Sequence, residues 1–124
     1  MLYGPPKGAP QEASFRASCG RAYYGAYAHA RDVLTTAGFL LPKDHSGHQV
    51  VVSLLKRSGD ANVKTAGSLL ETLRIERNEA DYDVGKQVRR PFQQKQSQIA
   101  VVRSHSIVTS VDEAAKKHKK LFIP

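Results

Sequence analysis

Apolar residues recur at steps of three and four along most of this chain, which is the spacing of helices that each bury one face. The first such stripe predicts a helix over about residues 12–37. Its apolar positions are Phe15, Cys19, Ala22, Ala26, Ala30, Val33 and Ala37. Gly38 should end this helix, because glycine readily adopts the left-handed backbone of a helix cap, and Phe39 can make the apolar contact that follows.

Helix-start signals predict two further helices. Ser46 with Gln49 three residues later is a capping-box pattern, so a second helix is expected from Ser46 to about Gly59. Asp60 should cap a third helix that reaches about Asn78 or Glu79. The expected inward positions of the two helices are Val50, Val51, Leu54 and Leu55, then Val63, Ala66, Leu69, Leu70 and Leu73.

The remaining part of the chain has the weakest pattern. A fourth helix is expected from Val84 or Pro91 to about Lys117. Its inward face is expected to hold Ile99, Val102, Ile107 and Val111. No segment alternates strictly between apolar and polar residues, so no sheet is expected.

The predicted fold is all-α, an up-and-down four- to five-helix bundle, because short connections favour antiparallel neighbours. A chain of 124 residues with 40% apolar content fits one domain. Residues 1–11 are rich in glycine and proline and are expected to form a flexible arm. The bundle should occupy residues 12–115, and residues 116–124 should form a basic tail.

The composition bears on where in the cell the protein is expected and on the state of its cysteine. No apolar run approaches the roughly 18 residues of a membrane span, and glycines and prolines interrupt any signal-like stretch near the N-terminus, so we expect a cytoplasmic protein without a membrane partner. Cys19 is the single cysteine, which excludes an internal disulfide, and its helical spacing from Phe15 and Ala22 predicts a buried thiol.

The net charge of +8 favours an acidic partner, of which nucleic acid is the commonest. Basic residues that could contact RNA phosphates are Arg74, Arg89, Arg90, Arg103, Lys116, Lys117, Lys119 and Lys120. The alternative for the terminal lysines is a solvated tail that only improves solubility. Aromatic residues between these positions are few, so phosphate contacts should dominate over base stacking.

Three segments together resemble the HEPN family, in particular its small single-domain branch with an Arg-x-x-Ala-Asp-Tyr signature. They are residues 21–31 (RAYYGAYAHAR), 45–48 (HSGH) and 77–83 (RNEADYD). The resemblance covers about residues 12–110. It implies a helical bundle that forms a homodimer, and often a metal-independent ribonuclease encoded beside a nucleotidyltransferase antitoxin. A surplus apolar residue on another side of the first helix, Tyr24, also favours a homodimer.

The resemblance also implies candidate site residues. Arg77 would bind the scissile phosphate, Asn78 would orient it, and Asp81 or Tyr82 would stand where the family has a histidine. No histidine lies between Arg77 and His105. Two functions therefore stay open: a ribonuclease toxin of a toxin–antitoxin or defence system, or a catalytically inactive interaction module that partners a nucleotidyltransferase.

Structural alternatives exist for each of these residues. Arg77 could form an ion pair with Asp81 four residues later, and Tyr82 could pack its ring between helices. His29 and His48 are expected to be structural histidines. Asp44, His45 and His48 lack the ligand set of a metal site, so neither a metal nor any other cofactor is expected. No phosphate-binding glycine loop occurs in the sequence.

Overall fold

The computed structural model describes residues 9–86 and 94–117, with the side chains of 13–78 and 95–117. Four helices make up these ranges: α1 (Ala9–Thr36), α2 (Ser46–Lys56), α3 (Ala61–Lys86) and α4 (Gln94–Lys117). No strand occurs in either range, which confirms the predicted all-α class for this part of the chain.

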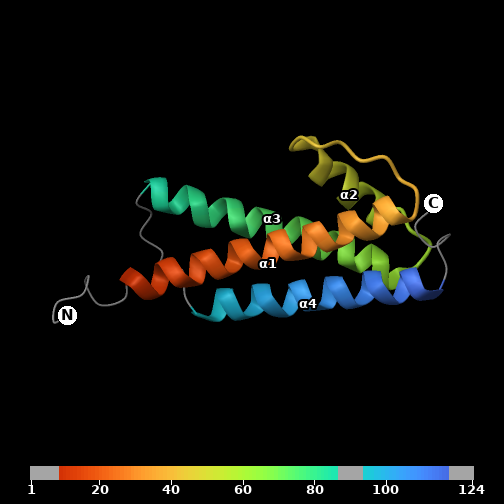
Figure 1. Ribbon diagram of the computed structural model, residues 1–124. Helices are drawn as coiled ribbons and strands as arrows, with labels where there is room; N and C mark the ends of the chain where they lie inside the picture. Colours follow the sequence, from red (N-terminus) through yellow and green to blue (C-terminus); the bar gives the residue numbers. More distant parts are fainter. Residues whose placement is uncertain (1–8, 87–93, 118–124) are drawn as a thin grey trace.

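Three long helices lie side by side, and the short α2 crosses one end of the molecule (Figure 1). α1 and α4 run in the same direction, and α3 runs in the opposite one (Figure 1). α1 packs against α4 and α3, whereas α2 packs mainly against α3. The result is a bundle-like arrangement in which α1, α2 and α3 meet at one end.

Two helix ends follow the local sequence signals. Gly38 has a φ of 107° and ends α1, with the amide of Phe39 donating to the carbonyl of Leu34 over 3.1 Å. This bond closes a glycine cap, and the Phe39 side chain packs against the core. Asp60 caps α3 as predicted, because its Oδ1 accepts hydrogen bonds from the amides of Asn62 and Val63 at 2.8 and 3.1 Å.

The predicted capping box of α2 is wrong. His45 occupies the N-cap position, without a side-chain cap bond. Asp44 instead accepts from the Ser46 amide at 2.9 Å and from the Ser46 hydroxyl at 2.5 Å. A carboxylate two residues before Ser46 thus takes the hydroxyl that the capping box would have used. The side-chain and backbone bonds from Ser46 lower the pKa of Asp44.

Other helix boundaries also differ from the prediction. α1 begins at Ala9, within the segment expected to be a flexible arm, and α2 ends at Lys56 before Gly59. α3 continues past Glu79 to Lys86, because no proline interrupts its hydrogen-bond ladder before Pro91. α4 is described from Gln94. The predicted start at Val84 is wrong, because Val84 belongs to α3, and the predicted start at Pro91 lies outside the described residues.

The core confirms most of the predicted apolar stripes. In α1, Cys19, Ala22, Ala26 and Ala30 are buried, and α2 and α3 bury Val51, Leu55, Val63, Ala66, Leu70 and Leu73. In α4 the prediction was right for Ile107 and Val111 but wrong for Val102, which is 68% exposed. Ala100 and Ala114 are buried instead, because they lie a helical step of seven before Ile107 and of three after Val111.

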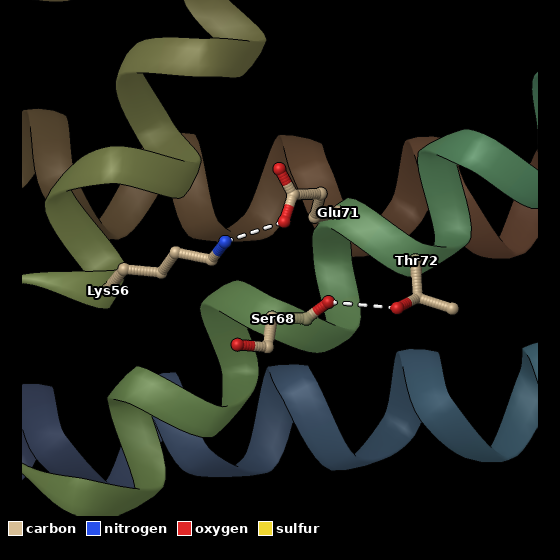
Figure 2. A network of polar contacts seen from close by, with 4 residues as sticks. All are labelled: Lys56, Ser68, Glu71 and Thr72. Carbon is tan, nitrogen blue, oxygen red and sulfur yellow. Dashed lines mark hydrogen bonds and ion pairs between the residues drawn. The ribbon is translucent and has the colours of Figure 1, made fainter.

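A close approach fixes α2 on α3. A Cβ at Gly67 would lie 3.0 Å from both Leu55 Cβ and Lys56 Cγ, so the absent side chain lets the two helices touch. Lys56 Nζ then reaches Glu71 Oε1 at 2.6 Å, and on α3 itself the Thr72 hydroxyl donates to the Ser68 carbonyl (Figure 2). Among the described helices, none has the length and hydropathy to cross a membrane.

Candidate functional site

An open groove of about 520 Å³ lies between α1 and α3. We call it the arginine groove; it is lined by Arg16, Ala17, Gly20, Arg21, Tyr24 and Arg77. The α1 residues share one face, because they recur at steps of three and four. A Cβ built at Gly20 would meet no atom within 4 Å, so small side chains leave the floor of the groove open.

Arg77 lies against two tyrosines in this groove. Its guanidinium carbon is 4.8 Å from the ring centroid of Tyr24 and 5.8 Å from that of Tyr23. Both distances are within the range of cation–π attraction. Its Nη1 also donates to Asn78 Oδ1 at 3.3 Å. The side chains of Asp81 and Tyr82 lie outside the described residues, so the predicted Arg77–Asp81 pair stays a prediction.

Tyr24 and Tyr23 face different environments although they are neighbours in sequence. Tyr24 is 52% exposed and Tyr23 is buried. Their rings meet edge to face, with 5.0 Å between the ring centroids.

The sequence did not predict the contact of Arg77 with these rings. The adjacent tyrosines were its only available signal, and the sequence does not show which turn of α1 faces Arg77.

Behind the groove, Tyr23 is hydrogen-bonded to His48 of α2, with 2.5 Å between the hydroxyl oxygen and Nδ1. Burial raises the pKa of Tyr23 to about 12, although the charges of Arg74 and Arg77 oppose the rise. Burial, with the charge of Arg74, lowers the pKa of His48 to about 4. Both groups are therefore neutral. We assign the Tyr23 hydroxyl as the donor, because this buried hydroxyl makes no other hydrogen bond among the described residues; His48 then accepts through Nδ1 and carries its proton on Nε2.

Close packing around Gly47 holds His48 in place. A Cβ at Gly47 would lie 2.6 Å from the Pro42 carbonyl oxygen and 2.9 Å from the Tyr27 hydroxyl. Arg31 donates to that hydroxyl at 3.1 Å and to the Leu41 carbonyl at 3.3 Å, which ties the segment before α2 to α1. The ring of Tyr27 stacks on Tyr23 at 5.9 Å. These contacts fix the start of α2, and with it His48, against α1.

The structure separates the basic residues that were predicted to bind nucleic acid. Arg74 lies one turn before Arg77 on α3, close enough to Tyr23 and His48 to shift the pKa of both. Arg103 instead pairs with Glu76 at 2.6 Å. Lys116 and Lys117 are exposed in the last turn of α4. The side chains of Arg89, Arg90, Lys119 and Lys120 lie outside the described residues.

The terminal lysines lie far from the arginine groove. α4 runs in the same direction as α1, so Lys117 is at the end of the bundle where α1 finishes (Figure 1). Arg16 lies in the first half of α1, roughly 30 Å along the axis before Thr36. A short ligand in the arginine groove therefore cannot contact Lys116 or Lys117 of the same molecule.

The other candidate residues have structural partners. His29 Nε2 lies 2.6 Å from Asp112 Oδ1, which links α1 to α4. Asp44 and His48 are engaged by Ser46 and Tyr23. Across the described side chains, no three His, Cys, Asp or Glu residues gather closely enough to hold a metal ion.

No family model, curated protein or solved structure matches this chain. The resemblance of residues 21–31 and 77–83 to the HEPN family therefore stays a prediction. The chemistry of the arginine groove follows from its own residues: three guanidinium groups suit phosphate oxygens, and the half-exposed ring of Tyr24 suits a planar base.

Proposed function

We propose that this protein is a HEPN-type nucleic-acid-binding protein that holds single-stranded RNA in the arginine groove. The observation that carries the proposal is the position of Arg77, which lies over the ring of Tyr24 in a groove that Arg16 and Arg21 also line. Guanidinium forks bind phosphate oxygens in pairs, and an exposed aromatic ring stacks on unpaired bases. Unstacked bases are available in single strands and not in duplexes.

In this proposal the protein acts as a metal-independent ribonuclease toxin in the cytoplasm. Arg77 binds the scissile phosphate, Asn78 orients it through its contact with Arg77, and Asp81 or Tyr82 takes the place of the family's histidine. The fold expected for this function is the up-and-down bundle of four to five helices. The described helices share with it an all-α, bundle-like arrangement in which α3 runs antiparallel to α1 and α4.

The proposal includes a homodimer. Support comes from large apolar side chains that stay exposed on α3 and α4, namely Ile75, Val101 and Val102. Ile75 and Val102 are the sequence neighbours of Glu76 and Arg103, whose ion pair joins the two helices. Exposed apolar side chains that gather on one surface commonly form subunit interfaces.

The alternative is a catalytically inactive module that partners a nucleotidyltransferase, and one observation favours it. His48 is the histidine that reaches the Arg77 cluster, through Tyr23, and its pKa is lowered to about 4. At neutral pH it is not the imidazolium that a general acid requires, and it is a weak base. Cleavage would then depend on Asp81 or Tyr82 alone.

Binding of a short fluorescent single-stranded RNA tests the groove. Arg77→Ala should weaken binding by about tenfold or more, the loss expected for a charge-assisted phosphate contact. Tyr24→Ala should weaken it as well, whereas Tyr24→Phe, which keeps the ring, should not. Lys64→Gln is the matched control, because Lys64 is an exposed cation on α3 outside the groove. Equal affinities for Arg77→Ala and Lys64→Gln would contradict the proposal.

Cleavage is a separate measurement. Purified protein is incubated with total RNA and with tRNA, with and without a divalent metal. Fragments that form in chelator and vanish with Arg77→Ala would support the ribonuclease. RNA binding without any fragment would favour the inactive module. A neighbouring gene that encodes a nucleotidyltransferase would be compatible with both the ribonuclease toxin and the inactive module, so the cleavage assay decides between these two functions.

A further inference from the structure

A second pocket, of about 240 Å³, lies between α2 and α3, and it is lined by His48, the partner of Tyr23. We call it the His48 pocket; the polar residues that line it and carry the argument are His48, Ser53, Lys56, Arg57, Glu71 and Arg74. It is smaller than the roughly 300–1,000 Å³ of pockets for drug-sized ligands. Its size suits a small anion, or one group of a larger ligand.

The charges that line this pocket do not balance. Lys56 and Glu71 neutralise one another across 2.6 Å, and the bond to Lys56 lowers the pKa of Glu71 (Figure 2). Arg57 and Arg74 remain as two further cations. Neither of them pairs with a carboxylate among the described side chains. The half-buried guanidinium of Arg74 therefore lacks a counter-ion, an arrangement that costs free energy until an anion arrives.

His48 contributes a hydrogen-bond donor with a fixed tautomer. The side chain is 5% exposed and lines the pocket. Tyr23 donates to its Nδ1, so the nitrogen left for a ligand is Nε2, which carries a proton. A neutral imidazole N–H donates to an anion without adding a third uncompensated charge. Ser53 adds a hydroxyl at the same pocket.

We propose that the His48 pocket binds a phosphate group, held by the guanidinium groups of Arg57 and Arg74 and by Nε2–H of His48. Two guanidinium groups present parallel N–H pairs that match phosphate oxygens, and a tetrahedral anion can accept from the imidazole and a hydroxyl as well. The group can belong to inorganic phosphate, to a mononucleotide or to a phosphorylated RNA end. This assignment stands whether or not RNA occupies the arginine groove.

Proton–nitrogen NMR on the intact protein tests the pocket directly. Inorganic phosphate is titrated at constant ionic strength against chloride. Bound phosphate should shift the amide signals of Gln49 and Ser53 and should raise the pKa of His48 from about 4 toward its ordinary value of 6.5, because a nearby anion favours the imidazolium. Signals that respond equally to chloride and phosphate, or no response at His48, would overturn the proposal.

Two variants and one control locate the site. Arg74→Gln should weaken phosphate binding by about tenfold or more. Arg57→Gln should weaken it too; because Arg57 is exposed, this variant keeps the test decisive if Arg74→Gln fails to fold. Lys64→Gln removes the same charge from α3 outside the pocket and should bind normally. An equal loss of phosphate affinity in all three variants would show that phosphate responds only to the overall positive charge of the protein, and it would overturn the proposal.

The same titration identifies the source of the phosphate. Adenosine monophosphate and a pair of short RNAs, one with a 5′-phosphate and one with a 5′-hydroxyl, are compared with inorganic phosphate. Tighter binding of the nucleotide or of the phosphorylated RNA at His48 assigns that source, and equal binding of all phosphates assigns a free anion. Equal binding of the two RNAs at His48 together with no response to inorganic phosphate would overturn the proposal.

Discussion

The hydroxyl of Tyr23 on α1 donates to Nδ1 of His48 on α2 across 2.5 Å, and both side chains are almost wholly removed from solvent. Burial keeps each group in one protonation state. Tyr23 stays protonated because burial raises its pKa to about 12, and His48 stays neutral because burial, with the charge of Arg74, lowers its pKa to about 4. Tyr23 also contacts Arg77 of the arginine groove, so this pair links residues of both proposed binding sites.

Tyr23→Phe should destabilise the protein by about 1–3 kcal/mol, because it leaves the buried Nδ1 of His48 without a donor. Tyr24→Phe removes a hydroxyl from the adjacent, half-exposed ring and should change the free energy of unfolding by less than about 0.5 kcal/mol. Urea denaturation of both variants beside the parent measures the difference. If the two variants lose the same stability, the Tyr23–His48 bond contributes nothing.

Stability should rise as pH increases from about 4 to 6.5, the window between the folded and ordinary pKa of His48. In this window the His48 imidazole is protonated in the unfolded chain but not in the folded chain, so a lower pH favours unfolding. The contribution is present in full above 6.5, is lost as pH falls toward 4, and amounts to at most about 3 kcal/mol.

The test compares urea unfolding across this pH window in His48→Gln and in His45→Gln, which removes an exposed histidine. His48→Gln should flatten the dependence, and His45→Gln should leave it. A steeper profile in the absence of His48 would show that other groups govern the acid response. An NMR titration of the His48 ring in the parent protein gives its pKa directly.

Gly47→Ala should destabilise the protein by about 1–3 kcal/mol, as overpacking does. The new methyl group would lie 2.6 Å from the Pro42 carbonyl oxygen, a backbone atom that cannot swing aside. Gly25→Ala is the control, because a Cβ there meets nothing within 4 Å and alanine favours an exposed helix position by about 0.5–1 kcal/mol. Thermal melts should therefore move in opposite directions, and a Gly47→Ala protein as stable as the parent would refute the close packing.

RNA binding should depend on the arginine groove more than on the end of α4 when the RNA is short. The double variant Arg16→Gln/Arg21→Gln should lower affinity and reduce the slope of log affinity against log salt by roughly 1.4, about 0.7 for each lost phosphate contact. Lys116→Gln/Lys117→Gln, with the same charge change at the far end of the bundle, should leave both unchanged. Equal effects of the two double variants would mean that RNA samples the whole basic surface.

The helix caps at Gly38 and Asp60 and most of the core could be predicted from the sequence, because their causes act within a few residues. The amide of Gly38 donates to the carbonyl of Thr35, three positions before it, and Asp60 accepts from amides two and three positions after it. The apolar stripe of α1 repeats within its own turns, so burial of Cys19 and Ala26 follows from spacing alone. Asp44 and Ser46 were both possible capping residues at the start of α2, and the sequence did not show which side chain would accept the backbone hydrogen bond.

The candidate site was only half accessible to sequence analysis. Arg77 and Asn78 were singled out by a motif, but the partners of Arg77 in the groove were not. Tyr24 lies 53 positions before Arg77, and Tyr23 lies 25 positions before His48. Such contacts form only when α1, α2 and α3 pack at particular positions along one another's axes.

The sequence by itself thus determined that this chain forms helices, where some of them begin or end, and which face most of them bury. Tertiary structure alone decided that Arg103 is held by Glu76, that Arg77 lies over Tyr24, and that His48 is a neutral acceptor. The physical reason is that local periodicity fixes which side of a helix is apolar, whereas the polar contacts depend on how far each helix slides and rotates against its neighbours. Close approaches at Gly47 and Gly67 set those positions, through atoms distant in sequence.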